Sequence, residues 1–235
     1  MKRLNTNKIQ IKDLQIGHQN KVLIQSMCNI KTENYREVAE QINKCAALGA
    51  DLMRVSIMDE KDAEAVKEIK KLINIPLVGD IHFDYRLALK AMENGIDKIR
   101  INPGNIGSEE NVKKVVDMAK KCNVPIRIGV NSGSLDKTVH DYSTTYTAAK
   151  LVESAKKHVE ILEKLEFYNI VISLKGSNPL ETIEAYRLAS KEFPNYPLHL
   201  GITEAGPKDV SLVRSSATLS PLLLEGIGDT IRISI

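Results

Sequence analysis

Tryptophan is missing from this sequence, and aromatic residues make up only 4% of its 235 residues. A core must therefore be aliphatic, and the 43% share of hydrophobic residues is enough to build one. Cysteine is scarce as well: Cys28, Cys45 and Cys122 are odd in number, far apart and without a CxxC pair. We expect reduced thiols in a cytoplasmic protein rather than a disulfide framework.

Long apolar runs and a dominant sign of charge are also lacking. No stretch approaches the roughly 20 apolar residues that cross a bilayer. Residues 1–13 contain basic side chains but no apolar run, so we expect no secretory signal. The 33 Lys and Arg against 30 Asp and Glu leave a net charge of +3, which argues against nucleic acid or a membrane as a partner.

Short runs rich in Ile and Val alternate with longer stretches of helical period. Eight runs are candidate strands, at 22–27, 51–57, 76–81, 98–102, 125–130, 170–175, 198–203 and 230–235. Strands that alternate with amphipathic helices imply parallel βαβ units. Eight such units predict a single substrate-binding domain over residues 1–235 with the TIM (β/α)₈ barrel fold. An open doubly wound sheet is the alternative.

Three segments lie outside this repeat. Residues 8–18 predict a small N-terminal hairpin that covers the barrel floor, and the polar stretch 131–150 is long enough to be functional or mobile. The last candidate strand ends at Ile235, so the final helix of a complete barrel is lacking. An uncovered strand exposes apolar surface, and we therefore expect either a longer natural chain or a partner over this seam.

Four candidate strands share nearly the same tetrapeptide, MRVS, IRIN, IRIG and IRIS, each with arginine in second place. Because side chains alternate along a strand, and a charged group does not belong beneath helices, these arginines should point into the barrel. They are Arg54, Arg100, Arg127 and Arg232. Asn102 and Ser234 lie two residues later on the same face, nearer the end where barrel enzymes keep their active sites.

Other polar residues end neighbouring strands: Asp80, His82, Lys175, Thr203 and Glu204. The four arginines and Lys175 then outnumber the two carboxylates, Asp80 and Glu204. Cations enclosed in a protein need anions as partners. Guanidinium groups match phosphate oxygens, so the missing anion is predicted to be a phosphate or diphosphate ligand. Alternatively, single arginines form ion pairs at the rim or floor.

Histidines offer little evidence for a metal site. Asp80 and His82 resemble a pair of ligands, but no third ligand of suitable spacing follows, so we expect no metal in this chain. His140 and His158 are expected at the surface.

With these residues in place, the chain resembles the barrel domain of the 4-hydroxy-3-methylbut-2-enyl diphosphate synthase family, iron–sulfur enzymes of the methylerythritol phosphate route to isoprenoids. Its most family-specific segments are DIHFDYRLA, RIGVNSGSL and GIGDTIRIS. Further matches in order along residues 22–235 are VLIQSM, ADLMRVSI, GIDKIRINPGNIG, IVISLKGSNP and HLGITEAG. The segment 206–221 departs from the family pattern, with Arg214 where the family has lysine.

The resemblance implies an oxidoreductase that reductively opens 2-C-methyl-D-erythritol 2,4-cyclodiphosphate. It implies a [4Fe–4S] cluster, ferredoxin or flavodoxin as electron donor, and a homodimer of the full-length protein. The family holds its cluster in a C-terminal domain that this sequence lacks, so we expect no cluster on this chain and no turnover by it alone.

The resemblance also implies residue roles. The diphosphate would be held by Arg54, Arg100, Arg127, Lys175, Arg232 and Ser234. Asn131 and Thr203 would orient the substrate. Glu204 would be the main acidic group on the cluster side, with Asp80 and His82 supporting the pocket. Two alternatives are a pterin-binding barrel of the dihydropteroate synthase type and a non-catalytic diphosphate-binding barrel fragment.

Overall fold

The computed structural model describes residues 3–131 and 147–234. Its main sheet has eight parallel strands in the order β8-β7-β6-β5-β4-β3-β10-β9, and a bridge between Ile172 and Leu198 closes it into a barrel. The strands are β3 (Leu23–Met27), β4 (Leu52–Ser56), β5 (Leu77–Asp80), β6 (Lys98–Ile101), β7 (Ile126–Asn131), β8 (Ile170–Lys175), β9 (His199–Leu200) and β10 (Thr230–Ile231). The predicted TIM barrel is confirmed, and the open sheet is wrong.

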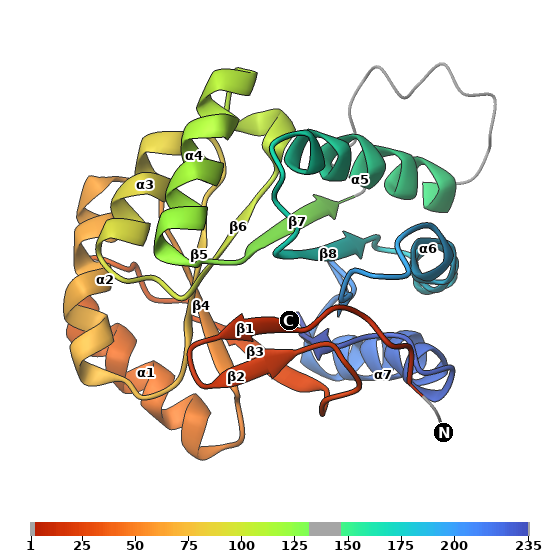
Figure 1. The fold of residues 1–235 in the computed structure, drawn as a ribbon. Coiled ribbons are helices and arrows are strands. Elements are labelled where there is room, and N and C mark those ends of the chain that lie inside the picture. Colours follow the sequence, from red (N-terminus) through yellow and green to blue (C-terminus); the bar gives the residue numbers. More distant parts are fainter. Residues whose placement is uncertain (1–2, 132–146, 235) are drawn as a thin grey trace.

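Helices ring these strands (Figure 1). They are α1 (Tyr35–Ala47), α2 (Glu60–Leu72), α3 (Tyr85–Glu93), α4 (Glu109–Cys122), α5 (Thr147–Lys164), α6 (Pro179–Glu192) and α7 (Lys208–Leu224), with a 3₁₀ turn η1 (Pro103–Asn105). In the described part of the chain no helix follows β10, as predicted. Ile24 on β3, whose register partner is Ile231 of β10, is accordingly 48% exposed. None of the described helices is both long and apolar enough to cross a membrane.

Side-chain caps fix where several helices begin. The carboxylates of Asp59 and Asp84 accept backbone N–H groups of α2 and α3, and Asn178 caps α6 with Pro179 in its first turn. Each cap follows the carboxyl end of a strand within a few residues. Short capped connections of this kind hold the strand ends of the barrel mouth in a fixed arrangement.

Alternation along the strands separates a dry outer layer from a charged interior. Val55, Ile99 and Ile126 are fully buried in the core between strands and helices, whereas the adjacent Arg54 and Arg100 are 8% and 7% exposed and line the interior. The inward direction predicted for the arginines is therefore confirmed. Near the uncovered seam the outer layer thins, and Ile233 beside Arg232 is 39% exposed.

A hairpin closes the opposite end of the barrel. Strands β1 (Ile9–Ile11) and β2 (Leu14–Ile16) pair antiparallel. Their buried side chains form one apolar cluster with the lowest inward residues of the barrel, which are Leu23, Leu52, Val78 and Val171. The predicted hairpin and its place on the barrel floor are confirmed.

One surface prediction fails. His158 on α5 is buried at 7% exposure, because α5 packs against β7, β8 and α6 together and so covers a wide face. His140 lies outside the described residues, as does most of the polar stretch 131–150.

Truncating a hairpin residue that seals the floor should destabilise the whole barrel. Ile11 is 1% exposed within the floor cluster, so Ile11→Ala is expected to lower the unfolding free energy by about 2–4 kcal/mol. The exposed neighbour Gln10 provides the control, and Gln10→Ala should change it by no more than about 0.5 kcal/mol. Urea unfolding followed by circular dichroism measures both. Equal effects at the two positions would show that the hairpin does not seal the core.

Candidate active site at the barrel mouth

A cavity of about 260 Å³ lies at the carboxyl ends of the barrel strands. It is lined by Arg54, Asp80, His82, Arg100, Arg127, Asn131, Ser173, Lys175, Thr203 and Arg232. Nine of the twelve predicted site residues are among these ten. The parallel topology accounts for this, because every strand ends at the same rim.

Asp80 is the hub of the polar contacts in the cavity. Its Oδ1 lies 3.2 Å from NH1 of Arg100, and its Oδ2 lies 3.6 Å from Nε of Arg54 and 3.4 Å from Nε2 of His82. Burial alone would raise the pKa of Asp80, but the His82 hydrogen bond and the nearby guanidinium groups outweigh it and hold that pKa below its usual range. An ionised carboxylate at this place fixes two arginines and is poorly suited to donate a proton.

The cations of the cavity outnumber its carboxylates. Five cationic side chains line it, and Asp80 is the one carboxylate among the lining residues. Arg127 is 1% exposed, and its Nε and NH1 have no hydrogen-bond partner among the described residues; the same is true of Lys175 Nζ. Burial and the neighbouring guanidinium charges lower the pKa of Lys175 well below its ordinary value. Such a pocket is electrostatically incomplete without an anion.

Two glycines make room for these cations. A Cβ on Gly129 would lie 2.2 Å from Nε of Arg100, and a Cβ on Gly201 would lie 2.5 Å from Nζ of Lys175. The Gly129 carbonyl also accepts a hydrogen bond of 2.9 Å from Arg100 NH2. The glycine of the IRIG tetrapeptide is thus explained by the close approach of a guanidinium group from the next strand.

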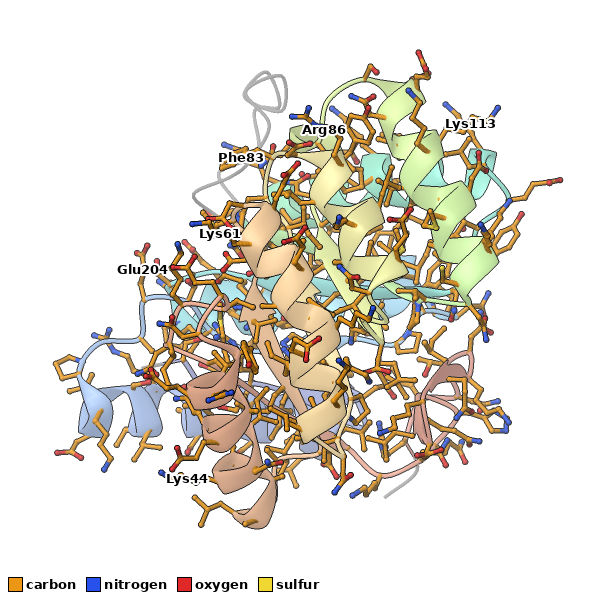
Figure 2. All side chains as sticks on the ribbon, turned by 90° about the vertical axis from the view of Figure 1, so that its left-hand side faces the viewer. Lys44, Lys61, Phe83, Arg86, Lys113 and Glu204 are labelled. Carbon is orange, nitrogen blue, oxygen red and sulfur yellow. The ribbon has the colours of Figure 1, made fainter. Side chains whose placement is uncertain are left out.

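Three predicted site residues do not line the cavity. Asn102 is buried where β6 passes into η1. Ser234 accepts a 2.5 Å hydrogen bond from Arg232 NH2, so it positions that guanidinium group. Glu204 is exposed just beyond β9, in a left-handed backbone conformation with φ of 52°. Figure 2 shows Glu204 on the same left-hand edge of the molecule as Phe83, which is 72% exposed.

Several interior polar side chains are not among the predicted site residues, and Ser173 and Lys98 are two of them. Ser173 lines the cavity, and Lys98 lies fully buried inside the barrel, deeper than the cavity. Each stands two residues before a predicted inward residue, Lys175 and Arg100 respectively. Strand alternation is enough to place both side chains in the interior, but neither stands at the carboxyl end of its strand, where active-site residues of barrels are expected.

The thiols do not gather into a ligand set. Cys28 is buried, Cys45 is partly buried and Cys122 is exposed. Burial, followed by the proximity of Cys45, raises the pKa of Cys28 to about 12, which disfavours the thiolate that metals bind. Across residues 3–131 and 147–234, no group of three or more His, Cys, Asp or Glu could hold a metal ion.

The fold and the cavity define an α/β barrel with a cationic pocket at the carboxyl ends of its strands. A sequence model of the GcpE TIM-barrel domain matches residues 6–235. This chain therefore belongs to the GcpE family, within the barrel domain of that family.

Named relatives agree with this assignment. The 4-hydroxy-3-methylbut-2-en-1-yl diphosphate synthase (flavodoxin) of Caldanaerobacter subterraneus is 56% identical over 98% of this chain and 64% of its own length. The enzymes of that name from Fusobacterium nucleatum and Clostridium perfringens are 52% and 51% identical, over 65% and 67% of their lengths. The chain thus spans about two thirds of the length of these relatives.

Solved structures share the fold at much lower identity. Dihydropteroate synthase from Stenotrophomonas maltophilia superposes with a TM-score of 0.72 at 13% identity, covering 97% of this chain and 92% of that one. A truncated 3-deoxy-D-arabino-heptulosonate 7-phosphate synthase from Thermotoga maritima gives 0.66 at 17% identity, over 97% and 79%. At these identities the likeness concerns the barrel alone, so it adds nothing to the pterin-binding alternative.

Removing the carboxylate hub should destabilise the barrel. Asp80→Asn leaves Arg54 and Arg100 buried without their counter-charge, and the expected loss of unfolding free energy is roughly 3–5 kcal/mol. Asp84→Asn is the matched control, because Asp84 pairs with Arg86 at the surface and asparagine caps a helix equally well. That control should lose less than about 1 kcal/mol. Chemical denaturation at neutral pH measures the difference, and equal losses would contradict the role given to Asp80.

Proposed function

We propose that this chain is the substrate-binding barrel of a 4-hydroxy-3-methylbut-2-en-1-yl diphosphate synthase. In the whole protein it would hold 2-C-methyl-D-erythritol 2,4-cyclodiphosphate while the ring is opened reductively. The observation that carries the proposal is the cavity with five cationic side chains and a single lining carboxylate. The relatives that share half of its residues are named for a diphosphate product, which supports the same ligand class.

A diphosphate suits this pocket better than a single phosphate. The guanidinium groups of Arg54 and Arg100 are fixed by Asp80 on one side. Arg54 Nε otherwise meets Met27 Sδ at 3.2 Å, and Arg232 NH1 meets the same sulfur at 3.4 Å. A thioether is a weak acceptor, so phosphate oxygens would be much stronger partners for both. Arg54 and Arg232 thus converge on one place beside Met27, and Arg100, Arg127 and Lys175 line the same cavity, so cations are present for two linked phosphate groups.

The remaining site residues would orient the rest of the ligand. Asn131 and Thr203 line the cavity and carry groups that bond substrate hydroxyls. Asn102 supports the turn after β6, since its carbonyl accepts the Asn105 N–H at 2.9 Å. Ser234 would hold Arg232 toward the diphosphate.

The two remaining residues with polar side chains, His82 and Glu204, lie in different parts of the mouth. His82 lies at the cavity wall beside Asp80 with 39% of its side chain exposed, so its ring can form a hydrogen bond to a ligand. We assign Glu204 to the outer rim, where it would face the part of the protein that carries the cluster. Its position outside the cavity lining gives it no contact with the diphosphate.

The reducing group has no place among the described residues. The thiols are dispersed and no metal-ligand group forms, so no electron-transfer step is assigned to this barrel. We propose that the [4Fe–4S] cluster belongs to the further third of a full-length, homodimeric protein, with flavodoxin or ferredoxin as the donor. The barrel by itself would bind the diphosphate without turning it over. It would differ from a non-catalytic diphosphate-binding fragment in that it takes part in turnover when the rest of the protein is present.

Loss of a mouth arginine should weaken diphosphate binding without unfolding the chain. Arg232 is partly buried beside Ser234, and Arg232→Gln removes a charged donor, which is expected to weaken binding by roughly tenfold to a hundredfold. Isothermal titration with inorganic diphosphate and with the cyclic diphosphate measures this.

The control is Arg187→Gln on α6, because Arg187 pairs with Glu225 on the outer surface. It should bind diphosphate like the unaltered chain. Binding of neither diphosphate to the unaltered chain would refute the proposed function. Equal weakening by the two substitutions would remove Arg232 from the site.

A further inference from the structure

Beneath the cavity lies a second polar layer, of which the proposed function uses Arg127 alone. It consists of Gln25 on β3, Lys98 on β6, Arg127 on β7 and His199 on β9, and we term it the lower tier. These side chains are between 0% and 2% exposed. Arg127 belongs to both levels, since it also lines the cavity. The tier therefore sits between the anion pocket and the apolar floor.

Hydrogen bonding within the lower tier is incomplete. Both amide atoms of Gln25, Nζ of Lys98, Nε and NH1 of Arg127 and Nε2 of His199 have no partner among the described residues. The other ring nitrogen of His199 lies 2.6 Å from Thr230 Oγ1. Natural proteins leave few buried polar atoms unpaired, so a cluster of them inside one barrel indicates a function rather than packing.

Lys98 is the least favourably placed member of the tier. The charges of Arg127 and Arg54 act on Lys98, and His199 is a further neighbour. The other ionisable groups of the interior surround Arg127 and Lys175; they are Asp80, Arg100 and Arg232. Asp80 is the single carboxylate in that set, and its oxygens are already engaged by Arg54, Arg100 and His82. A buried ammonium group among guanidinium groups is strongly disfavoured, and lysine escapes by losing its proton, whereas arginine cannot.

We propose that Lys98 is neutral in the empty barrel and takes up a proton when a diphosphate binds in the cavity above it. The anion supplies the negative charge that the interior lacks, and the charged ammonium then stabilises it from below without touching it. This rests on the proposed diphosphate site and adds a proton to its binding equilibrium. The protonation is an acid–base step only: the Nζ lone pair accepts a proton from solvent, and no other bond changes.

Burial, then the charges of Arg127 and Arg54, lower the pKa of Lys98 well below its ordinary value, in keeping with this placement. Two opposite pH dependences follow. At pH values between the lowered pKa of Lys98 in the folded barrel and about 10.4, Lys98 carries a proton in the unfolded chain but not in the folded one. The free energy of unfolding of the empty barrel therefore rises with pH over this range. Diphosphate affinity should fall over the same range, because binding requires that proton.

Calorimetric titration with inorganic diphosphate in two buffers of different ionisation enthalpy counts the protons taken up. Lys98→Met removes the amine and keeps the chain length. It is expected to bind diphosphate roughly tenfold more weakly, as for a charge near the anion but not in contact with it. It should also take up about one proton less than the unaltered chain. Lys156→Met, which removes a surface lysine paired with Glu192, should leave affinity and proton count unchanged.

The outcomes separate this inference from the proposed function. Diphosphate binding with the same proton count in Lys98→Met and in the unaltered chain overturns the inference and leaves the diphosphate site standing. No diphosphate binding to the unaltered chain overturns both. A merely structural role for Lys98 would lower the melting temperature and leave the proton count unchanged.

A measurement without substitution covers a variant that fails to fold. In the unaltered chain with ¹³C-labelled lysine, the Cε resonance of Lys98 should show a neutral-amine shift and move to an ammonium shift on addition of diphosphate. If that resonance has an ammonium shift before diphosphate is added, or keeps a neutral-amine shift afterwards, the inference fails.

Discussion

Enclosed positive charge, held in place by one carboxylate, is the constraint on which the mouth of this barrel depends. Asp80 fixes Arg54 and Arg100 across two neighbouring strands and cannot satisfy the remaining cations. The space those cations need is provided by backbone, at Gly129 and Gly201. The unpaired cations lower the free energy of unfolding of the empty barrel, and the same cations select an anionic ligand. Stability and ligand choice are therefore coupled.

Much of this could be predicted because it follows from strand periodicity. A charged residue flanked by Ile, Val or Met on a buried parallel strand has one direction open to it, and the four tetrapeptides repeat that condition. Closure of the sheet followed from the count of βα units, and the hairpin was visible as a short alternating segment before the first barrel strand. These are local signals, and tertiary contacts did not override them.

What the sequence did not reveal depends on depth and on distant packing. Thr203, Glu204 and Ser234 all follow strand ends, but only Thr203 is among the residues that line the cavity. Ser234 accepts a hydrogen bond from Arg232, and Glu204 lies exposed in a left-handed backbone conformation. Periodicity along one strand does not say how far that strand's end stands above its neighbours in a tilted barrel. The burial of His158 is not predicted, for a related reason: how much of the surface of α5 is covered depends on its packing against α6.

The apolar hairpin beneath the barrel has a kinetic consequence. Because Ile9, Ile11 and Ile16 seal the floor, the interior of the barrel is closed at that end and opens to solvent at the mouth. Whatever enters must leave by the same route and past the same cations. A reaction that alters the carbon skeleton but keeps the diphosphate would leave its product as firmly held as its substrate. Product release, rather than the chemical step, would then limit the turnover rate of such an enzyme, and accumulated product would compete with substrate for the cavity.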